Sequence, residues 1–247
     1  MTKLNGQTAW ITGGGTGIGA AGAQALAASG AAVVLSGRRA EPLEAVAEEI
    51  RSAGGQASVV PLDTADADAV RAAAEAIGPV DILVASAGLN VPDRSMSRVT
   101  DEGWDKVVGV NLNGMFYTAR AVLPGMRAKG GGTLILISSW AGRYATRLTG
   151  AAYNASKRAV IALNESINDE EGGNGIRSTV IMPGEVATDI LKTRPSPPSQ
   201  AEMDRMLSAE DLGDTIRFVA EMPARACLNE ILISPTWNRF YQGFDEL

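Results

Sequence analysis

The sequence contains no histidine and only one cysteine, Cys227. These absences argue against disulfide bonds, against zinc sites with the usual ligands, and against catalysis through Ser-His or Cys-His pairs. No metal site is therefore expected. The protein must move protons with other side chains.

Basic residues are also scarce, since 22 Lys and Arg face 28 Asp and Glu, for a net charge of −6. Nucleic-acid surfaces and anionic membrane patches need clustered Lys and Arg, so neither is expected. No stretch approaches the roughly 18 apolar residues of a membrane span, and the start of the chain lacks a basic region followed by an apolar one. We expect a cytoplasmic protein whose partners are small molecules or further copies of itself.

Short apolar stretches alternate with helical segments along the 247 residues, of which 45% are hydrophobic. This alternation predicts parallel βαβ units in one domain over residues 1–247, an α/β fold with a doubly wound sheet flanked by helices. The expected strands are 8–12, 31–36, 57–62, 80–85, 133–137, 176–182 and 229–234. The expected helices are 18–29, 41–53, 65–76, 101–129, 151–169 and 210–220. Such sheets bind ligands beyond the carboxyl ends of their strands.

A glycine-rich turn separates the first strand from the first helix. Its glycines are Gly13, Gly14, Gly15, Gly17 and Gly19. Glycines let a backbone approach a pyrophosphate closely, and the N-terminus of the following helix attracts the anion. The spacing is TGxxxGxG rather than the common GxGxxG, and a merely tight turn is the alternative. We expect a dinucleotide site here.

The end of the second strand carries Gly37, Arg38 and Arg39. An acidic residue at this place would bind the ribose of NAD, whereas an arginine accommodates the 2′-phosphate of NADP. NADP(H) is therefore favoured, and NAD(H) stays open because Gly37 leaves room for either ribose. Surface arginines that only start a helix are the alternative.

The segment 137–157 places two serines, Ser138 and Ser139, at a strand end, followed by Tyr153 and Lys157 four residues apart. On a helix this spacing puts the phenol and the ammonium on one face. A phenol titrates near pH ~10, and a nearby cation lowers that pKa, which makes tyrosine usable as a general acid or base. A surface pair and a serine cap are the alternatives.

Two other features call for a role. Asn111 lies inside the expected helix 101–129, where a kink or a water site would explain it and a solvent-facing side chain is the alternative. Residues 188–206 are rich in Pro and Ser and are expected to form a lid or substrate wall. The C-terminal aromatic residues suit a subunit contact; they are Trp237, Phe240, Tyr241 and Phe244.

Together these motifs resemble those of the short-chain dehydrogenase/reductase family, over residues 8 to about 233. The matching elements are TGGGTGIG at 12–19, Asp63, SAG at 86–88, NLNG at 111–114, ISS at 137–139, YNASK at 153–157 and PGEVAT at 183–188. Two departures stand out. Ala85 and Ser86 replace two usual asparagines, and the gap from Ser139 to Tyr153 is one residue longer than usual, which keeps Ser138 as an alternative catalytic serine.

The resemblance implies an NAD(P)-dependent oxidoreductase that interconverts a secondary alcohol and a carbonyl, assembled as a tetramer or dimer. Tyr153 would exchange the proton, Ser139 would position the substrate oxygen, Lys157 would lower the pKa of Tyr153 and bind the nicotinamide ribose, and Asn111 would hold a water. The cofactor residues would be Gly13, Gly15, Thr16, Gly17, Ile18, Gly19, Arg38, Arg39, Asp63, Thr64, Ala87, Gly88, Tyr153, Lys157, Pro183, Gly184, Val186 and Thr188.

The C-terminal region resembles the subgroup that acts on hydroxy acids or small polyols, so a small polar or anionic hydroxy substrate is expected. One of four arginines in loops near the expected pocket could bind a carboxylate or another anion, although for each one taken singly a solvated surface residue is the favoured interpretation. They are Arg94, Arg143, Arg147 and Arg194. The SAG departure leaves a second hypothesis open, an NADP(H)-binding regulator with little catalytic activity.

Overall fold

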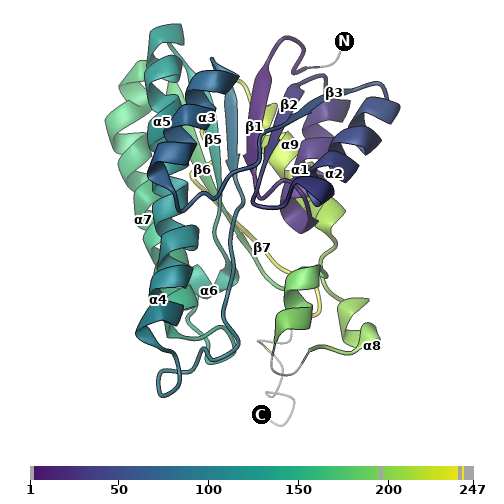
Figure 1. Ribbon diagram of the computed structural model, residues 1–247, viewed down its shortest axis with the longest axis vertical. Helices are drawn as coiled ribbons and strands as arrows, with labels where there is room; N and C mark the ends of the chain where they lie inside the picture. Colours follow the sequence, from purple (N-terminus) through teal and green to yellow (C-terminus); the bar gives the residue numbers. More distant parts are fainter. Residues whose placement is uncertain (1–2, 195–196, 239–240, 242–247) are drawn as a thin grey trace.

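The computed structural model describes residues 3–194, 197–238 and 241, and its centre is a seven-stranded parallel sheet (Figure 1). The strand order is β3-β2-β1-β4-β5-β6-β7. The strands are β1 (Thr8–Thr12), β2 (Ala32–Ser36), β3 (Gln56–Val59), β4 (Ile82–Ala85), β5 (Gly132–Ile137), β6 (Ile176–Pro183) and β7 (Glu230–Ile233). The predicted α/β fold with a doubly wound parallel sheet is confirmed.

Helices cover both faces of the sheet (Figure 1). One face carries α1 (Gly17–Ala28), α2 (Ala40–Ser52) and α9 (Ala209–Ala220). The other carries α3 (Ala67–Ile77), α4 (Asp101–Val108), α5 (Gly114–Lys129) and α7 (Ala151–Glu171). None of the helices in the described part of the chain combines the length and the apolarity that crossing a membrane requires.

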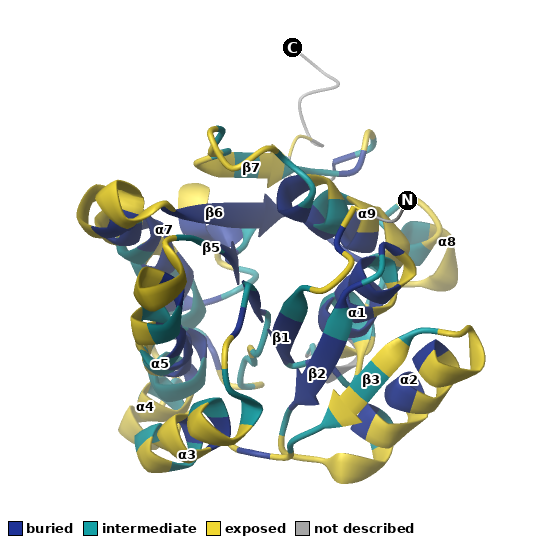
Figure 2. Cartoon of the chain, turned by 90° about the horizontal axis from the view of Figure 1, so that it is seen from above, coloured by how far each residue is buried: buried dark blue, intermediate teal, exposed yellow. Residues whose placement is uncertain are grey.

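Alternate residues of the five inner strands enter two separate cores. Ala9 and Ile11 of β1 pack with α1 and α9, whereas Trp10 between them packs on the opposite face. This two-residue period is what a strand buried on both faces produces. Figure 2 shows β1, β2 and β6 as largely buried, with exposed residues on the outer sides of the helices. The sheet is therefore a rigid base for the loops at its ends.

Most expected elements lie within two residues of their predicted bounds, and three differ in an informative way. The strand expected at 57–62 ends at Val59. The helix expected at 101–129 is interrupted by a π-helical turn, Gly109–Asn113. The segment 188–206 is not a plain loop, because it contains a 3₁₀ helix, Asp189–Thr193, and the short helix α8, Gln200–Met203.

The strand order reverses direction at β1, which pairs with β2 on one side and with β4 on the other. The loops that leave the carboxyl ends of β1 and β4 therefore run in opposite directions and leave a crevice between them. In Figure 1 this end of the sheet faces downward, towards α8 and the short helix α6, Trp140–Arg143. The candidate site lies at this end.

Candidate active site

Two adjoining cavities occupy the crevice beyond the strand ends. The larger, of about 260 Å³, is lined by Ser139, Tyr153 and Lys157 together with the glycine turn. The smaller, of about 150 Å³, is lined by Arg38, Arg39, Asp63 and Thr64. Both share Gly13, Thr16, Ala87 and Gly88. The two cavities form one elongated crevice across the switch point of the sheet.

The glycine turn is packed so closely that side chains cannot fit at two of its positions. A Cβ on Gly19 would lie 2.2 Å from the carbonyl oxygen of Gly13. A Cβ on Gly13, whose φ is +70°, would lie 2.8 Å from the backbone nitrogen of Ala87. Glycine is therefore required at both positions, and the backbone of the turn is left open to the crevice.

Helix α1 begins at the floor of this crevice. Its N-cap residue Thr16 makes no side-chain capping bond, and the first turn from Gly17 contains no acidic residue. The N–H groups of this turn and the positive end of the helix dipole thus remain available for an anion. Gly17, Ile18 and Thr188 all line the larger cavity, and a Cβ on Gly17 would lie 3.2 Å from the methyl carbon of Thr188.

The smaller cavity has an exposed basic side. Arg38 and Arg39 are both exposed, at the end of β2. Asp63 is exposed as well, and its Oδ1 accepts a hydrogen bond from the N–H of Ala65 at 3.0 Å. Thr64 is 4% exposed and packs against Gly114. These residues line the part of the crevice beyond the ends of β2 and β3.

Tyr153 and Lys157 lie in the first two turns of α7 and both line the larger cavity. Lys157 is only 3% exposed, and its Nζ donates to the carbonyl oxygen of Ile137 at 2.8 Å. The same Nζ lies 5.7 Å from the centre of the Tyr153 ring. A Cβ on Gly88 would be 3.3 Å from this ammonium, so the lysine packs closely against the loop after β4.

Burial dominates the titration of both groups. Loss of solvent lowers the pKa of Lys157 to about 7. Loss of solvent likewise raises the pKa of Tyr153, against the opposing effects of a hydrogen bond with Ser139 and of the charges of Arg194 and Arg94. The expectation that Lys157 lowers the tyrosine pKa does not hold in this structure. A buried ammonium with a lowered pKa is itself only partly charged near neutral pH.

The two serines at the end of β5 have different partners. The hydroxyl of Ser138 is 3% exposed and donates to the carbonyl oxygen of Lys157 at 2.7 Å, which ties the strand to α7. The hydroxyl of Ser139 caps α6 by accepting from the N–H of Ala141 at 3.1 Å, and it hydrogen-bonds the Tyr153 phenol. The geometry therefore brings Ser139 to the tyrosine and gives Ser138 a structural bond.

Asn111 is fully buried in the π-helical turn between α4 and α5. Its Oδ1 accepts from the N–H of Leu89 at 2.8 Å, while its Nδ2 donates to the carbonyl oxygen of Leu89 at 3.0 Å. The Nδ2 also lies 3.3 Å from the hydroxyl of Ser156. The solvent-facing alternative is wrong: Asn111 fixes the loop after β4, next to Gly88 and Lys157.

The loop after β6 forms the wall opposite Tyr153. Pro183, Gly184, Val186 and Thr188 all line the larger cavity, as expected. Residue 185, between these motif positions, was missed: the Glu185 carboxylate pairs with Arg194 at 2.6 Å, and the two side chains are 6% and 10% exposed. An acidic residue inside a motif followed by an arginine nine residues later was the only signal in the sequence.

The other candidate residues fall into three groups. Arg94 is 8% exposed. Burial and the charge of the nearby Arg194 lower the pKa of Arg94. Arg94 also lies near Tyr153, whose pKa burial raises and both arginine charges lower. Arg143 and Arg147 are absent from the lining of both cavities. Ser86 lines the larger cavity with Ala87, so the departure at this motif leaves the wall in place.

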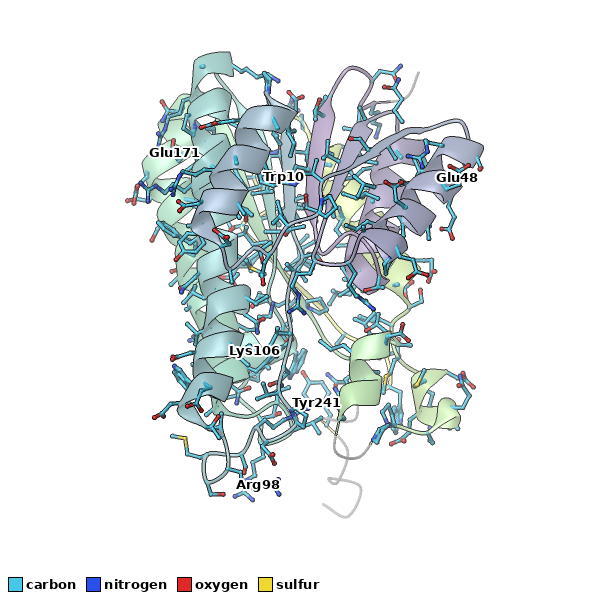
Figure 3. The ribbon with its side chains drawn as sticks, viewed as in Figure 1. Trp10, Glu48, Arg98, Lys106, Glu171 and Tyr241 are labelled. Carbon is cyan, nitrogen blue, oxygen red and sulfur yellow. The ribbon has the colours of Figure 1, made fainter. Side chains whose placement is uncertain are left out.

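Two of the C-terminal aromatic residues can be placed. Trp237 stacks under the guanidinium of Arg205 at 5.1 Å, and the Tyr241 ring lies 5.5 Å from that of Trp140. Figure 3 shows Tyr241 at the lower end of the molecule, far from Glu48 and Glu171. Phe240 and Phe244 lie outside the described residues. No group of His, Cys, Asp and Glu within the described ranges could hold a metal ion.

A doubly wound sheet with a glycine turn at its switch point defines a protein of the dinucleotide-binding α/β class. The family model for short chain dehydrogenases matches residues 7–198. The chain belongs to this family.

Similar proteins cover nearly the whole chain. It is 33% identical over 242 residues to an uncharacterized oxidoreductase of Staphylococcus haemolyticus, covering 95% of this chain and 100% of that protein. It is 37% identical over 244 residues to the glycine betaine reductase ATRR of Emericella nidulans, covering 94% of this chain. The chain spans only 19% of the length of ATRR.

Solved structures agree with the fold. A metagenomic short-chain oxidoreductase in complex with NADP superposes with a TM-score of 0.82 at 33% identity, covering 95% of this chain and 99% of that one. A putative NAD(P)-dependent gluconate 5-dehydrogenase from Beutenbergia cavernae, with bound NADP, gives 0.83 at 30% identity and covers 93% and 95%.

Proposed function

We propose that the protein interconverts a secondary alcohol and a carbonyl with a nicotinamide dinucleotide cofactor. The observation that carries this proposal is the meeting of Ser139, Tyr153 and Lys157 in one cavity that continues into the dinucleotide crevice. When bound, the cofactor supplies or accepts the hydride. The side chains of this cavity then have to handle one proton and one polar oxygen.

Tyr153 is the group proposed to exchange that proton. Because burial raises the pKa of Tyr153, its hydroxyl is protonated at neutral pH and can donate to a developing alkoxide. Ser139, which hydrogen-bonds the phenol, can donate to the same oxygen and orient it. Lys157 is proposed to return a proton to the tyrosine, and Asn111 holds the loop against which the lysine packs.

We propose that NADP(H) lies along this crevice, across both cavities. The open N-terminus of α1 suits the pyrophosphate, and Thr188 and Gly184 flank the cavity of Tyr153, where the nicotinamide end would lie. Arg38 and Arg39 are proposed to bind the 2′-phosphate. Two of the similar solved structures contain NADP, which supports NADP(H) over NAD(H) without excluding the latter.

The substrate is proposed to be a small polar or anionic hydroxy compound or the matching carbonyl. One similar protein is described as a putative gluconate dehydrogenase and another as a glycine betaine reductase. The first name implies an anionic substrate. An acidic and a basic side chain, Glu185 and Arg194, line the same cavity as Tyr153, which supports a polar substrate.

Replacement of Tyr153 by Phe tests the proposal. Turnover with NADPH across a panel of ketones, aldehydes and keto acids should fall by about 10³-fold or more, because the general acid is lost while the ring remains. Binding of NADPH, followed by its fluorescence, should change less than about threefold. Ser139→Ala should reduce turnover by about 100-fold and the matched Ser138→Ala much less. Retained turnover in Tyr153→Phe would sink the assignment.

The regulator hypothesis is not favoured, because the catalytic groups share one cavity and the SAG departure leaves its wall intact. It would gain support only if wild-type protein bound NADPH and turned over no member of the panel. Assembly as a dimer or tetramer and a cytoplasmic location remain part of the proposal; light scattering of the purified protein would test the first.

A further inference from the structure

The substrate end of the larger cavity contains an arginine that is held in place by a buried acid. Nη1 of Arg194 donates to Oε1 of Glu185 at 2.6 Å, and the two side chains are 10% and 6% exposed. Both residues line the cavity together with Ser139 and Tyr153. A buried ion pair of this kind fixes the plane of the guanidinium.

Most of the hydrogen-bonding capacity of Arg194 is left for a ligand. A guanidinium has five N–H donors and no acceptor. Within the described ranges, the bond to Glu185 is the only hydrogen bond that its side chain makes. Arg194 also lines the cavity, and two acceptor atoms in one plane, as in a carboxylate, would match its remaining donors.

The surroundings of Tyr153 also favour negative charge. Arg94, 8% exposed, is close enough for its charge and that of Arg194 to act on the phenol. The backbone of Arg94 packs closely against Gly150, since a Cβ on Gly150, whose φ is +79°, would lie 2.2 Å from the carbonyl oxygen of Arg94. Glu185 in the same wall opposes a second negative charge, so the site suits a monoanion better than a dianion.

We propose that the substrate carries a carboxylate beside its reacting carbon, bound by the free edge of Arg194, with Glu185 orienting that arginine. This inference rests on the function proposed above. It assigns the substrate to the hydroxy monocarboxylic acids and the corresponding keto acids. Arg194 is thus a specificity residue, and Glu185 is its positioning residue.

The test compares two 2-oxo acids, pyruvate and benzoylformate, with their own methyl esters at saturating NADPH. Wild-type protein should have a kcat/KM for the best acid at least about 10-fold above that for its ester. Arg194→Gln should lower kcat/KM for the acid by roughly 10- to 100-fold, chiefly through KM, and that for the ester by less than about threefold. NADPH binding and the melting temperature of the variant report on cofactor contacts and folding.

Arg143→Gln is the matched control, because this arginine is half-exposed, pairs with Glu230 at 3.9 Å and does not line the cavity. It should leave the acid-to-ester ratio unchanged. Glu185→Gln should raise the turnover of oxaloacetate relative to pyruvate, since the opposing charge is gone. If Glu185→Gln left the turnover of oxaloacetate relative to pyruvate unchanged, the positioning role of Glu185 would be overturned.

The remaining outcomes separate this inference from the proposed function. Turnover of esters or neutral ketones without a preference for acids would overturn the inference and leave the oxidoreductase standing. So would an equal loss for acid and ester in Arg194→Gln. Absence of any turnover, equal to that of Tyr153→Phe, would overturn both.

Discussion

The two ends of the crevice differ in how far their charged side chains are exposed to solvent. At the open end, Arg38, Arg39 and Asp63 are exposed on loops. At the closed end, Lys157 is buried and the Arg194 side chain is 10% exposed. Charges in water are screened, whereas buried charges interact strongly, and burial lowers the pKa of Lys157. The proposed phosphate site at the open end therefore costs little folding stability. At the closed end the burial of the Lys157 ammonium lowers folding stability, and its proposed role in proton transfer gives a reason for that cost.

The glycine turn lines both ends of the crevice, so Gly19→Ala should disturb cofactor binding at both ends. The new Cβ would lie 2.2 Å from the carbonyl oxygen of Gly13, so the turn must move, and the proposed pyrophosphate site moves with it. We expect NADPH binding to weaken by roughly 100-fold in a fluorescence titration. Gly125→Ala on α5, where no atom lies within 4 Å of the added Cβ, is the control. Equal binding by both variants would contradict the role of the turn.

Lys157→Met sharpens the contrast at the closed end by removing its buried charge. The pKa of Lys157 is lowered from 10.5 to about 7, so below pH 7 the folded protein carries the full cost of the buried ammonium. The cost disappears as the pH rises from about 7 to 10.5, because the unfolded chain then binds more protons than the folded one. The wild type should therefore gain stability relative to the variant over this window.

Thermal melting of cofactor-free protein between pH 6 and 10 measures this effect. At pH 7 the methionine variant should be more stable by roughly 2 kcal/mol, since the ~4 kcal/mol gained from the lost desolvation is offset by the unpaired carbonyl of Ile137. Lys106→Met on α4, an exposed lysine labelled in Figure 3, should change stability by less than ~0.5 kcal/mol. A melting difference that is independent of pH would refute the buried charge.

Arg38→Ala addresses the open end and should have the smallest effect. Loss of one exposed phosphate contact should reduce kcat/KM for NADPH by about 10-fold and leave that for NADH within about twofold. Stability should not change, because the side chain is exposed. Arg71→Ala, exposed on α3 and outside both cavities, is the control. If the ratio of kcat/KM for NADPH to that for NADH did not change, Arg38 would not bind the 2′-phosphate.

Local patterns were sufficient to predict the parts of the site that lie next to strands and helices. The glycine turn follows an apolar strand, and the four-residue spacing of Tyr153 and Lys157 is a property of one helix, so both could be read from short stretches. The direction of the tyrosine pKa could not be read, because it depends on burial by the whole fold. The Glu185–Arg194 pair depends on the path of the segment 188–206, whose Pro and Ser content carries no period.

The π-helical turn Gly109–Asn113 connects α4 directly to α5 and changes the direction in which the side chains of α5 point relative to those of α4. Each residue of an α-helix advances by about 100°, so one residue added to a turn rotates everything after it by that angle. Asn111 points to Leu89 at this joint, while Met115, one turn later, still enters the core. Deleting one residue here would convert the π-helical turn into regular α-helix. Either Asn111 or Met115 would then point away from its present partners. The number of residues in this segment is thus as much a part of the site as their identity.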